Sequence, residues 1–599
     1  MRHDRRQFLG AGLALGIATP GRAAAPGATP FRHGVASGDP HADGLLLWTR
    51  VSDAPPGQPV NGRWQLAASA DFASPLAEGG FSTDAARDYT VKVEVDGLRP
   101  GTDYFYRFTA LGRHSPVGRA RTLPQGALAE LNIALCCCAV YFRGYFHAYA
   151  EMAAMARLDV VLFLGDYIYE YGLKNLTREQ LVHLPDPAHD TVTLDDYRRR
   201  YAQTRSDPSL QAAHARAPWI CMWDDHELAN DDWSGGAQNH VSERDGPWEA
   251  RKAVAVQAYL EWMPIRDPAP QLRRYDVERS FAFGQLATLI LPETRLKARD
   301  RQLSLTRDIE WRLLDVSDPA HPVPVSDPAL LALAPAALPA HIKRVPDAAA
   351  LRRKLDAPQR RMLGEEQMRW VEGEMRGSVK AGRPWVLFAS ETVMASTVCP
   401  DLTPWVRAPG RKTRPSTLPG LAAMLNALYE LSRFKMPMVG LDSWDGYGAE
   451  RKRLYEMIER TGARTVVLSG DSHMAWANEL HHQQRRVAVE VSSSTLTGPT
   501  FAELIQVEDV PFGRLLAEQS PDVHWCDAQA IGFIHVRITP AAVQANFINV
   551  DAPAAPRPGC SVVKRIEAKA ESGGVGPWRE LGEPGEPGEP VQPVAPARG

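Results

Sequence analysis

Two short apolar runs, each followed by Gly-Asp, mark the hydrophobic pattern of the chain. Residues 160–164 read VVLFL and lead to Asp166, and residues 465–469 read TVVLS and lead to Asp471. Runs of this length and composition predict buried strands. Ligands of open α/β sheets bind beyond the carboxyl ends of the strands, where each Asp would stand. A single such Asp could equally cap a turn. The two together predict a metal centre assembled from both halves of one sheet.

From residue 131 onward, runs with strand composition alternate with stretches of helical periodicity. This alternation predicts an α/β fold. The expected strands are 131–138, 160–165, 218–227 running into a loop, the hairpin 275–295, 385–391, 465–471, 486–494 and 533–546, and the expected helices are 149–157, 194–204, 250–262, 364–375 and 449–461.

The flanking regions have different patterns. Residues 31–126 contain short strands separated by turns and predict a small β-sandwich, in which residues 97–104 (GLRPGTDY) resemble a tyrosine corner. Residues 317–346, rich in Pro, Ala and Asp, predict an irregular surface insertion. Residues 573–599, with the run GEPGEPGEP, predict a disordered tail.

Length and charge limit the possible functions. A chain of 599 residues exceeds one ordinary domain, so we expect one large core and at least one smaller module. The formal net charge of −3 shows no excess of positive charge, which argues against nucleic-acid partners. No stretch reaches about 18 apolar residues, so no membrane span is expected in the mature protein.

The amino terminus has the composition of an export signal. Arg5 and Arg6 precede Gln-Phe-Leu and an apolar Gly/Ala-rich stretch, and small residues near residue 25 offer a cleavage site. Residues 1–25 therefore resemble a twin-arginine signal peptide, although Asp4 stands where that pattern usually has Ser or Thr. A general-secretion signal is the alternative. Either predicts a bacterial periplasmic or secreted protein, and the first predicts the twin-arginine export machinery as a partner.

Seven cysteines allow at most three disulfides, so one must stay free, pair between chains or bind metal. They are Cys136, Cys137, Cys138, Cys221, Cys399, Cys526 and Cys560. The three consecutive cysteines are poorly placed for mutual disulfides, because neighbouring residues in a strand point to opposite faces.

Side chains that bind metals gather just beyond the predicted strands. They are Cys138 after the first, Asp166 and Tyr169 after the second, Asp224, Asp225, His226, Glu227, Asn230, Asp231 and Asp232 after the third, and Asp471 and His473 late in the chain. Thiolate and phenolate favour an ion such as Fe(III), whereas clustered carboxylate and amide oxygens suit Ca²⁺, Mg²⁺ or Mn²⁺.

Six strings in register extend this pattern: GVASGDP with GLLLWTRV, LGDYIYEY, WDDHE, RKAVAVQAYLEWMPIR, SWDGY and LSGDSHMAWANEL. From about residue 31 to about residue 549 they closely resemble the PhoD family of alkaline phosphatases, within the metallophosphoesterase superfamily. The resemblance implies a four-layer α/β/β/α metallophosphoesterase domain, here 130–565, after an Ig/fibronectin-like β-sandwich. It also implies Fe(III) and Ca²⁺ as cofactors and hydrolysis of phosphate mono- and diesters.

The resemblance also suggests roles for single residues. Asp166 would bridge the metals, and Cys138 and Tyr169 would bind iron, although Cys138 taken alone could be a buried structural thiol. The remaining expected metal ligands are Asp225, Asn230, Asp471 and His473.

Two residues are expected to act on the substrate. His226 would protonate the leaving group or contact phosphate, and Arg295 could stabilise charge on the leaving oxygen. Two neighbours have open roles: Glu227 could cap a helix or touch a metal, and Asp224 could orient His226.

This sequence departs from the family pattern in four places. Cys137 and Ala139 flank the candidate thiolate in place of Ser and Gln, Glu293 replaces Asp, and Asp522 stands where a His is typical. The predicted function is a secreted metal-dependent alkaline phosphatase acting on small phosphate esters by attack of a metal-activated water or oxide on phosphorus. A phospholipase-D-like phosphodiesterase acting on lipid headgroups and a non-catalytic metal or phosphate binder are the alternatives.

Overall fold

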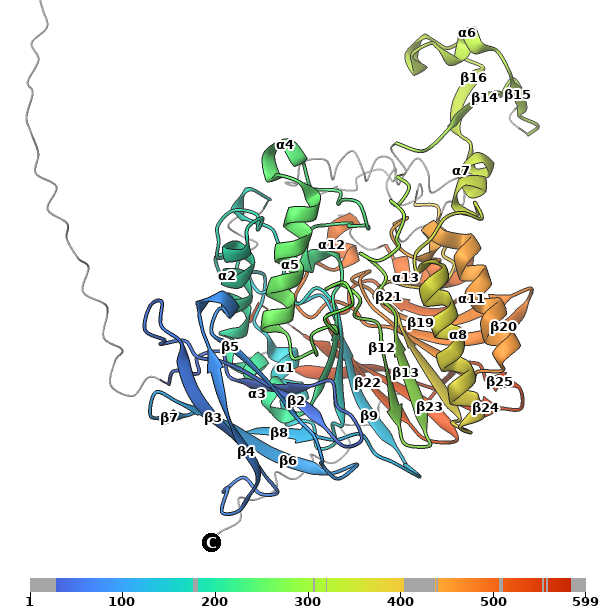
Figure 1. Cartoon of the computed structure of the whole chain (residues 1–599). Coiled ribbons are helices and arrows are strands. Elements are labelled where there is room, and N and C mark those ends of the chain that lie inside the picture. The colour runs from blue at the N-terminus through green and yellow to red at the C-terminus, as the bar shows by residue number, and fades with distance from the viewer. Residues whose placement is uncertain are drawn as a thin grey trace, which may run out of the picture.

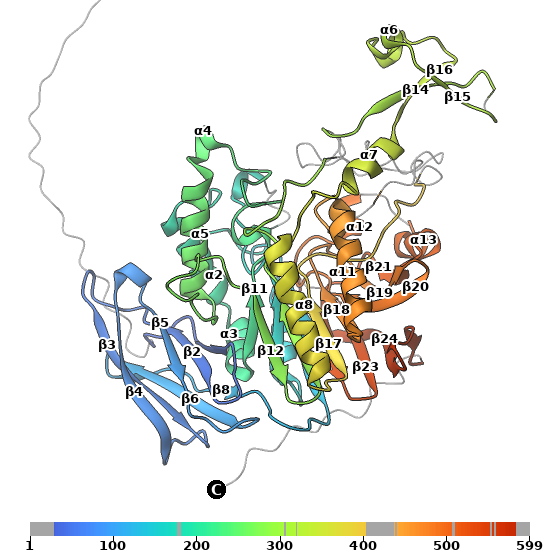
Figure 2. The ribbon, with the colours of Figure 1, turned by 45° about the vertical axis from the view of Figure 1, so that its right-hand side comes forward.

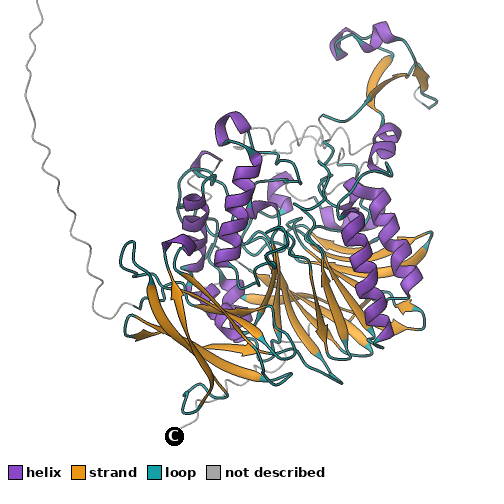
Figure 3. Ribbon diagram, in the orientation of Figure 1, coloured by secondary structure: helices purple, strands orange, loops and turns teal. Residues whose placement is uncertain are grey.

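The computed structural model describes residues 29–582, apart from 176–180, 305–306, 319, 403–436, 438–439, 506–509, 552–553 and 556–558. The predicted signal peptide, residues 1–25, lies outside the described residues. Within them, two large sheets pack face to face and carry helices on their outer sides (Figures 1 and 3).

The larger sheet has eleven strands in the described part of the chain and is centred on three parallel strands, β9 (Leu131–Cys136), β10 (Val160–Leu164) and β11 (Trp219–Met222). Beyond β9 lie β22 (Gly532–Ile538), β23 (Ala542–Val550), β24 (Cys560–Glu571), β25 (Gly574–Val575) and β26 (Arg579–Glu580), and beyond β11 lie β1 (Val35–Gly38), β2 (Leu45–Arg50) and β5 (Thr90–Val95).

The second sheet has seven strands among the described residues. Their order is β12 (Arg279–Phe283), β13 (Ala287–Leu291), β17 (Trp385–Ala389), β18 (Thr465–Ser469), β20 (Arg485–Ser492), β19 (Ala475–His482) and β21 (Val523–Asp527). Both faces of this sheet are covered, as strand β17 illustrates. Trp385 and Leu387 join the core between the sheets, whereas Val386 and Phe388 join the core under the outer helices.

Helices form the two outer layers (Figures 1 and 2). On the side of the larger sheet are α1 (His147–Ala154), α2 (Leu194–Arg205), α3 (Pro208–Arg216), α4 (Ser242–Asp245) and α5 (Trp248–Trp262), and on the other side are α8 (Gly364–Lys380), α11 (Gly448–Thr461), α12 (Phe501–Ile505) and α13 (Phe512–Gln519). This is the predicted α/β/β/α order. The prediction that one sheet supplies both Gly-Asp strands is wrong, because β10 and β18 belong to different sheets.

The amino-terminal β-sandwich packs a second sheet against β1, β2 and β5. That sheet contains β4 (Pro75–Thr83), β3 (Val60–Ala67), β6 (Asp103–Ala110), β7 (Arg113–His114) and β8 (Gly118–Arg121). The tyrosine corner is confirmed, since the Arg99 backbone N–H donates to Tyr104 Oη over 2.8 Å. The sandwich is not separate from the larger sheet: β1 pairs with β11 through Gly38, where an added Cβ would lie 1.9 Å from the Pro264 carbonyl oxygen.

Two regions are more ordered than the sequence predicts. The insertion 317–346 contains part of a small sheet formed by β15 (Val323–Val325), β14 (Trp311–Asp315) and β16 (Ile342–Pro346), which with α6 (Pro328–Leu331) projects beyond α7 (Ala348–Leu355) (Figure 2). The prediction of a disordered tail from residue 573 is wrong for residues 573–582, where β25 and β26 extend the sheet and Trp578 is buried. This sheet therefore continues past the expected domain end at residue 565.

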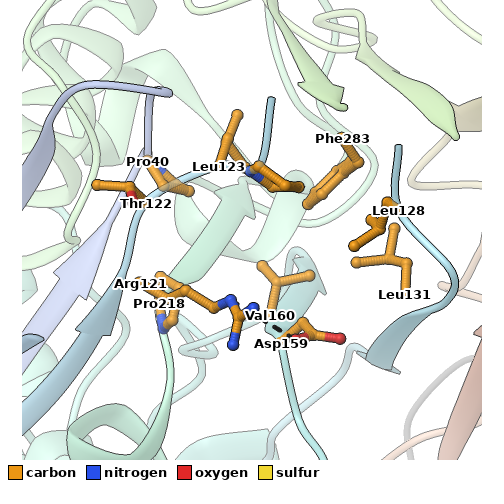
Figure 4. Close-up of a pocket in the computed structure, with 11 residues that line it drawn as sticks. Pro40, Arg121, Thr122, Leu123, Leu128, Leu131, Asp159, Val160, Pro218 and Phe283 are labelled. Carbon is orange, nitrogen blue, oxygen red and sulfur yellow. Dashed lines mark ion pairs between the residues drawn. The ribbon is translucent and has the colours of Figure 1, made fainter. Parts of the chain in front are cut away.

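The carboxyl ends of β9, β10, β11 and β18 lead into the loops that carry the candidate ligands. The opposite ends of β9 and β10 border a cavity of about 20 Å³ (Figure 4). Apolar side chains such as Leu131 and Val160 line it, together with the ion pair between Arg121 and Asp159 at 3.9 Å. A volume of this size holds about one water molecule, so it is too small for a substrate.

Candidate metal centre

Four of the predicted metal ligands have left-handed backbone conformations. Their φ angles are +58° at Cys138, +60° at Asp166, +66° at Asp471 and +55° at His473. A non-glycine residue in this region costs on the order of 1 kcal/mol or more, and such residues concentrate at functional sites. The chain turns sharply after each strand and thereby directs these side chains toward a common point.

Asp166 is the centre of the cluster, because it belongs to each of three groups of potential ligand atoms lying within 4.8 Å of one another. The groups are Cys138, Asp166 and His473; Asp166, Asp225 and His226; and Asp166, Asp224, Asp225 and Asp471. One group therefore contains sulfur and nitrogen donors, and another contains four carboxylates.

The first side of the cluster combines thiol, phenol and imidazole. The Asp166 Oδ2 atom accepts from Tyr169 Oη at 3.0 Å and from Cys138 Sγ at 3.4 Å. Tyr169 Oη also lies 3.1 Å from His473 Nε2. The Nδ1 atom of His473 donates to the Pro499 carbonyl at 2.6 Å, which leaves the Nε2 lone pair for a ligand. Burial lowers the pKa of His473 to about 4, so this imidazole is neutral.

The second side is a concentration of buried negative charge. Burial raises the pKa of Asp166 and Asp471 well above the usual range, and neighbouring carboxylates raise it further. Asp224 Oδ2 and Asp225 Oδ1 are buried without a hydrogen-bond partner among the described residues. Unpartnered buried oxygens and like charges at this distance are costly unless a cation lies between them. The donor set therefore fits metal ions on both sides of Asp166.

His226 is held beside this cluster by a carboxylate that the sequence analysis did not single out. Its Nδ1 atom lies 2.7 Å from Glu170 Oε2, and its ring packs on Tyr169 with centroids 4.1 Å apart. Burial would lower the pKa of His226, but Asp225, Glu170 and Asp166 raise it well above its usual value. Glu170, and not Asp224, therefore orients this imidazole.

Arg295 forms ion pairs with carboxylates. Its side chain is fully buried, and its Nε and NH1 atoms donate to Asp224 Oδ1 and to Asp442 Oδ2, the latter at 2.7 Å. Its NH2 atom lies 3.8 Å from Asp225 Oδ1. The guanidinium therefore holds carboxylates in place, and contact of Arg295 with the leaving oxygen stays a prediction.

Asn230 makes two side-chain hydrogen bonds. Its Oδ1 accepts from Tyr171 Oη at 2.6 Å, and its Nδ2 donates to Gln238 Oε1 at 2.6 Å. Because an amide oxygen has two lone pairs, Oδ1 can keep its bond to Tyr171 and still bind a metal, and this role stays a prediction. Asn230 belongs to none of the three groups around Asp166.

Glu227 and Glu293 shape the loops. The Glu227 carboxylate accepts from the backbone N–H groups of Asp166, Tyr167 and Asp224 at 2.6–2.9 Å. Of the two roles considered for Glu227, these bonds favour stabilising the turn rather than binding a metal. Glu293 similarly accepts from three backbone N–H groups and from Trp223 Nε1. Glu293, which is one methylene longer than the Asp of the family pattern, therefore stabilises the turn that follows β13.

Asp522, which stands where the family typically has a His, lies apart from the cluster. It bonds to His481 Nδ1 at 3.0 Å and to the Ser396 backbone, so it belongs to no group around Asp166.

The Cys137 and Cys138 sulfurs lie 3.3 Å apart. The expectation that neighbouring cysteines point apart is thus wrong here, because Cys138 has a left-handed backbone. All seven cysteines are free thiols in the structure.

Thiol, phenol, imidazole and carboxylates gathered at strand ends between two packed sheets are typical of metal-dependent hydrolases. Comparison with known proteins identifies the family: residues 133–547 match the model described as PhoD-like phosphatase, and residues 16–124 match its N-terminal domain. The chain therefore belongs to the PhoD-like phosphatase family and is a phosphoric ester hydrolase.

Two relatives support this assignment. Alkaline phosphatase D of Bacillus subtilis strain 168 is 32% identical over 527 residues, which cover 83% of this chain and 75% of that protein. A solved structure titled "Structure of PhoD" has 27% sequence identity and a TM-score of 0.70 over 93% of each chain. The fold expected from the sequence is confirmed by this match.

Among the described residues, none of the helices combines the length and apolar character needed to cross a bilayer.

Metal removal should destabilise the protein. The carboxylates around Asp166 repel one another without a cation, so a metal present at 100 times its Kd should add about 2.7 kcal/mol to the free energy of unfolding. Calorimetry before and after chelation would measure this shift. Asp471→Asn should reduce it, whereas Asp522→Asn, a buried carboxylate outside the cluster, should retain it. Equal shifts in both variants would contradict the assignment.

Proposed function

We propose that the protein is an exported alkaline phosphatase that hydrolyses phosphate monoesters and diesters with metal ions bound on both sides of Asp166. The observation that carries this proposal is that Asp166 is shared by a sulfur-, nitrogen- and phenol-containing group and by a carboxylate group. Family membership supports the reaction class, and the name of the Bacillus relative supports the alkaline phosphatase assignment.

The two sides of Asp166 suit different ions. Cys138, Tyr169 and His473 would hold Fe(III), because a thiolate and a phenolate favour a highly charged, borderline ion. Asp225 and Asp471 would hold Ca²⁺, with Asp224 as a further carboxylate of this group. Asn230 would add its amide oxygen through the lone pair that does not accept from Tyr171. When bound, these ions would neutralise phosphate oxygens and lower the pKa of the attacking water.

The protein residues around them bind and orient the substrate. His226 donates through Nδ1 to Glu170, so its Nε2 can deliver a proton to the departing ester oxygen. Packing on Tyr169 fixes the plane of the ring, and the side chain keeps 11% of its surface exposed. Arg295 is a positioning residue, because its fully buried guanidinium holds Asp224 and Asp442 in place.

Loss of the shared carboxylate tests this assignment. Asp166→Ala should lower phosphatase kcat by more than about 100-fold, because even outer-shell partners change metal affinity or activity by 10–100-fold. Circular dichroism should stay that of the folded protein. Asp522→Asn is the matched control and should keep its activity. A folded Asp166→Ala variant with normal turnover would show that Asp166 does not hold the metals.

A phosphodiesterase acting on lipid headgroups is the second candidate function. The observation that favours it is the projecting region formed by β14 and the insertion (Figure 1). In this region Trp311, Val323 and Leu333 expose 45%, 60% and 37% of their surfaces. p-Nitrophenyl phosphate, bis-p-nitrophenyl phosphate and phosphatidylcholine should be compared with and without calcium chelation. We expect chelator-sensitive turnover of the first two. Preferential hydrolysis of phosphatidylcholine would instead favour the lipid enzyme.

Export by the twin-arginine route is part of the proposal, and it rests on the sequence of residues 1–25. This route carries folded proteins, which is compatible with metal loading before export. Replacing both Arg5 and Arg6 by Lys should leave the uncleaved precursor in the cytoplasm, as cell fractionation would show. Unchanged export would instead indicate the general-secretion alternative.

A further inference from the structure

Arg205, the last residue of α2, is a buried cation between the amino-terminal sandwich and the catalytic sheets. Its side chain is 1% exposed, and its guanidinium stacks on Trp48 of β2 at 3.8 Å from the ring centroid. One nitrogen, NH1, lies 3.3 Å from Tyr167 Oη and 3.2 Å from His214 Nε2. Each of these three neighbours is itself fully buried.

The other edge of this guanidinium has no partner. Arg205 Nε and NH2 are buried and make no hydrogen bond within the described residues. These two atoms form the side of the fork that grips a carboxylate or another anion with two parallel bonds. Arg198, two turns earlier on the same helix, binds a carboxylate with the same two atoms. Its Nε and NH2 each donate to the Glu261 carboxylate at 2.7 Å.

Within the part of the chain that the structure describes, no acidic side chain forms an ion pair with Arg205. Among the described residues, no carboxylate oxygen lies within 4.0 Å of its nitrogens. Burial lowers the pKa of Arg205, and the groups that oppose this effect are Tyr167, Cys221 and Tyr106. An arginine keeps its proton in proteins, and an isolated buried charge is strongly unfavourable. Stacking on Trp48 offsets part of this cost but leaves both N–H groups unsatisfied.

The described neighbours of Arg205 are hydrogen-bond donors or neutral rings. Tyr106 Oη of β6 is buried and makes no hydrogen bond within the described residues, and the charge of Arg205 acts on this phenol. Burial and Arg205 together lower the pKa of His214 well below its usual value, so that ring is neutral. Water could satisfy the N–H groups but would leave the positive charge uncompensated.

We propose that the Nε/NH2 edge of Arg205 binds a small monovalent inorganic anion, chloride in most media, at the junction of the sandwich and the catalytic sheets. A single buried cation matches one negative charge. Its neighbours come from the sandwich (Trp48) and from the catalytic part (Tyr167 and His214), so a bound anion would stabilise the contact between the two parts. This proposal does not depend on the metal ions or on the reaction.

Bromide is the direct probe, because its anomalous scattering distinguishes it from water. Crystals of the full chain grown in sodium bromide should show an anomalous peak within hydrogen-bonding distance of both Arg205 Nε and NH2. The peak should be absent in Arg205→Met. An ordered water there, without anomalous signal, would overturn the proposal, and so would a peak that persists in the variant.

Thermal unfolding in solution gives a second test that does not need crystals. At constant ionic strength kept with sulfate, raising chloride tenfold above its Kd should raise the Tm of the wild-type protein by about 1–3 °C. Arg205→Lys, which keeps the charge but lacks the fork, should lose most of this dependence. Arg198→Met should be less stable yet keep the dependence, because its fork holds Glu261. The same chloride dependence in all three proteins would contradict the site.

Discussion

The repulsion among the carboxylates around Asp166 is the constraint on which the rest of the site depends. Four such groups lie within a few ångströms of one another and are buried, which ordinary protein interactions do not make favourable. Arg295 and His226 compensate part of this negative charge. Arg295 pairs with Asp224 and lies near Asp225, and His226 lowers the pKa of Asp166. Bound metal ions would supply the remainder, and the affinity for them would follow from the cost of leaving these carboxylates without a cation. The repulsion that makes this cluster unfavourable without a cation thus favours the binding of highly charged cations.

The scaffold must hold this unfavourable arrangement in place, and backbone bonds between loops do so. The Cys138 and Ala139 N–H groups donate to the carbonyls of Gly165 and Asp166 at 3.1 and 2.8 Å, which ties the first two loops together. The Cys138 carbonyl in turn accepts from Leu496 N and Thr495 Oγ1, so the loop after β9 is bonded to the segment that follows β20. Since β9 and β20 belong to different sheets, these bonds align the two halves of the site.

The amino-terminal sandwich contributes to this rigidity more than a separate module would. Its strand β1 continues the catalytic sheet beside β11, and Trp48 of β2 donates to the Glu261 carbonyl of α5 while supporting Arg205. The helices α2 and α5, on the outer side of the larger sheet, are thus fixed from the sandwich side. A charge-compensating anion at Arg205 would act on the same junction, so the stability of the catalytic part and that of the sandwich are linked.

The sequence by itself determined the strands, because runs such as VVLFL are too apolar to lie anywhere but in a core, and it placed Asp166 and Asp471 just beyond them. It also contained the family motifs, and with them the layers and the reaction class. Tertiary structure alone decided how these pieces combine. The two Gly-Asp strands lie in different sheets, Glu170 orients His226, and Arg295 forms ion pairs with Asp224 and Asp442. Residues 573–582 add strands to the sheet, although their composition suggested disorder. Each of these depends on contacts between residues far apart in the chain, whereas local pattern reports only whether a segment can be buried and in which conformation.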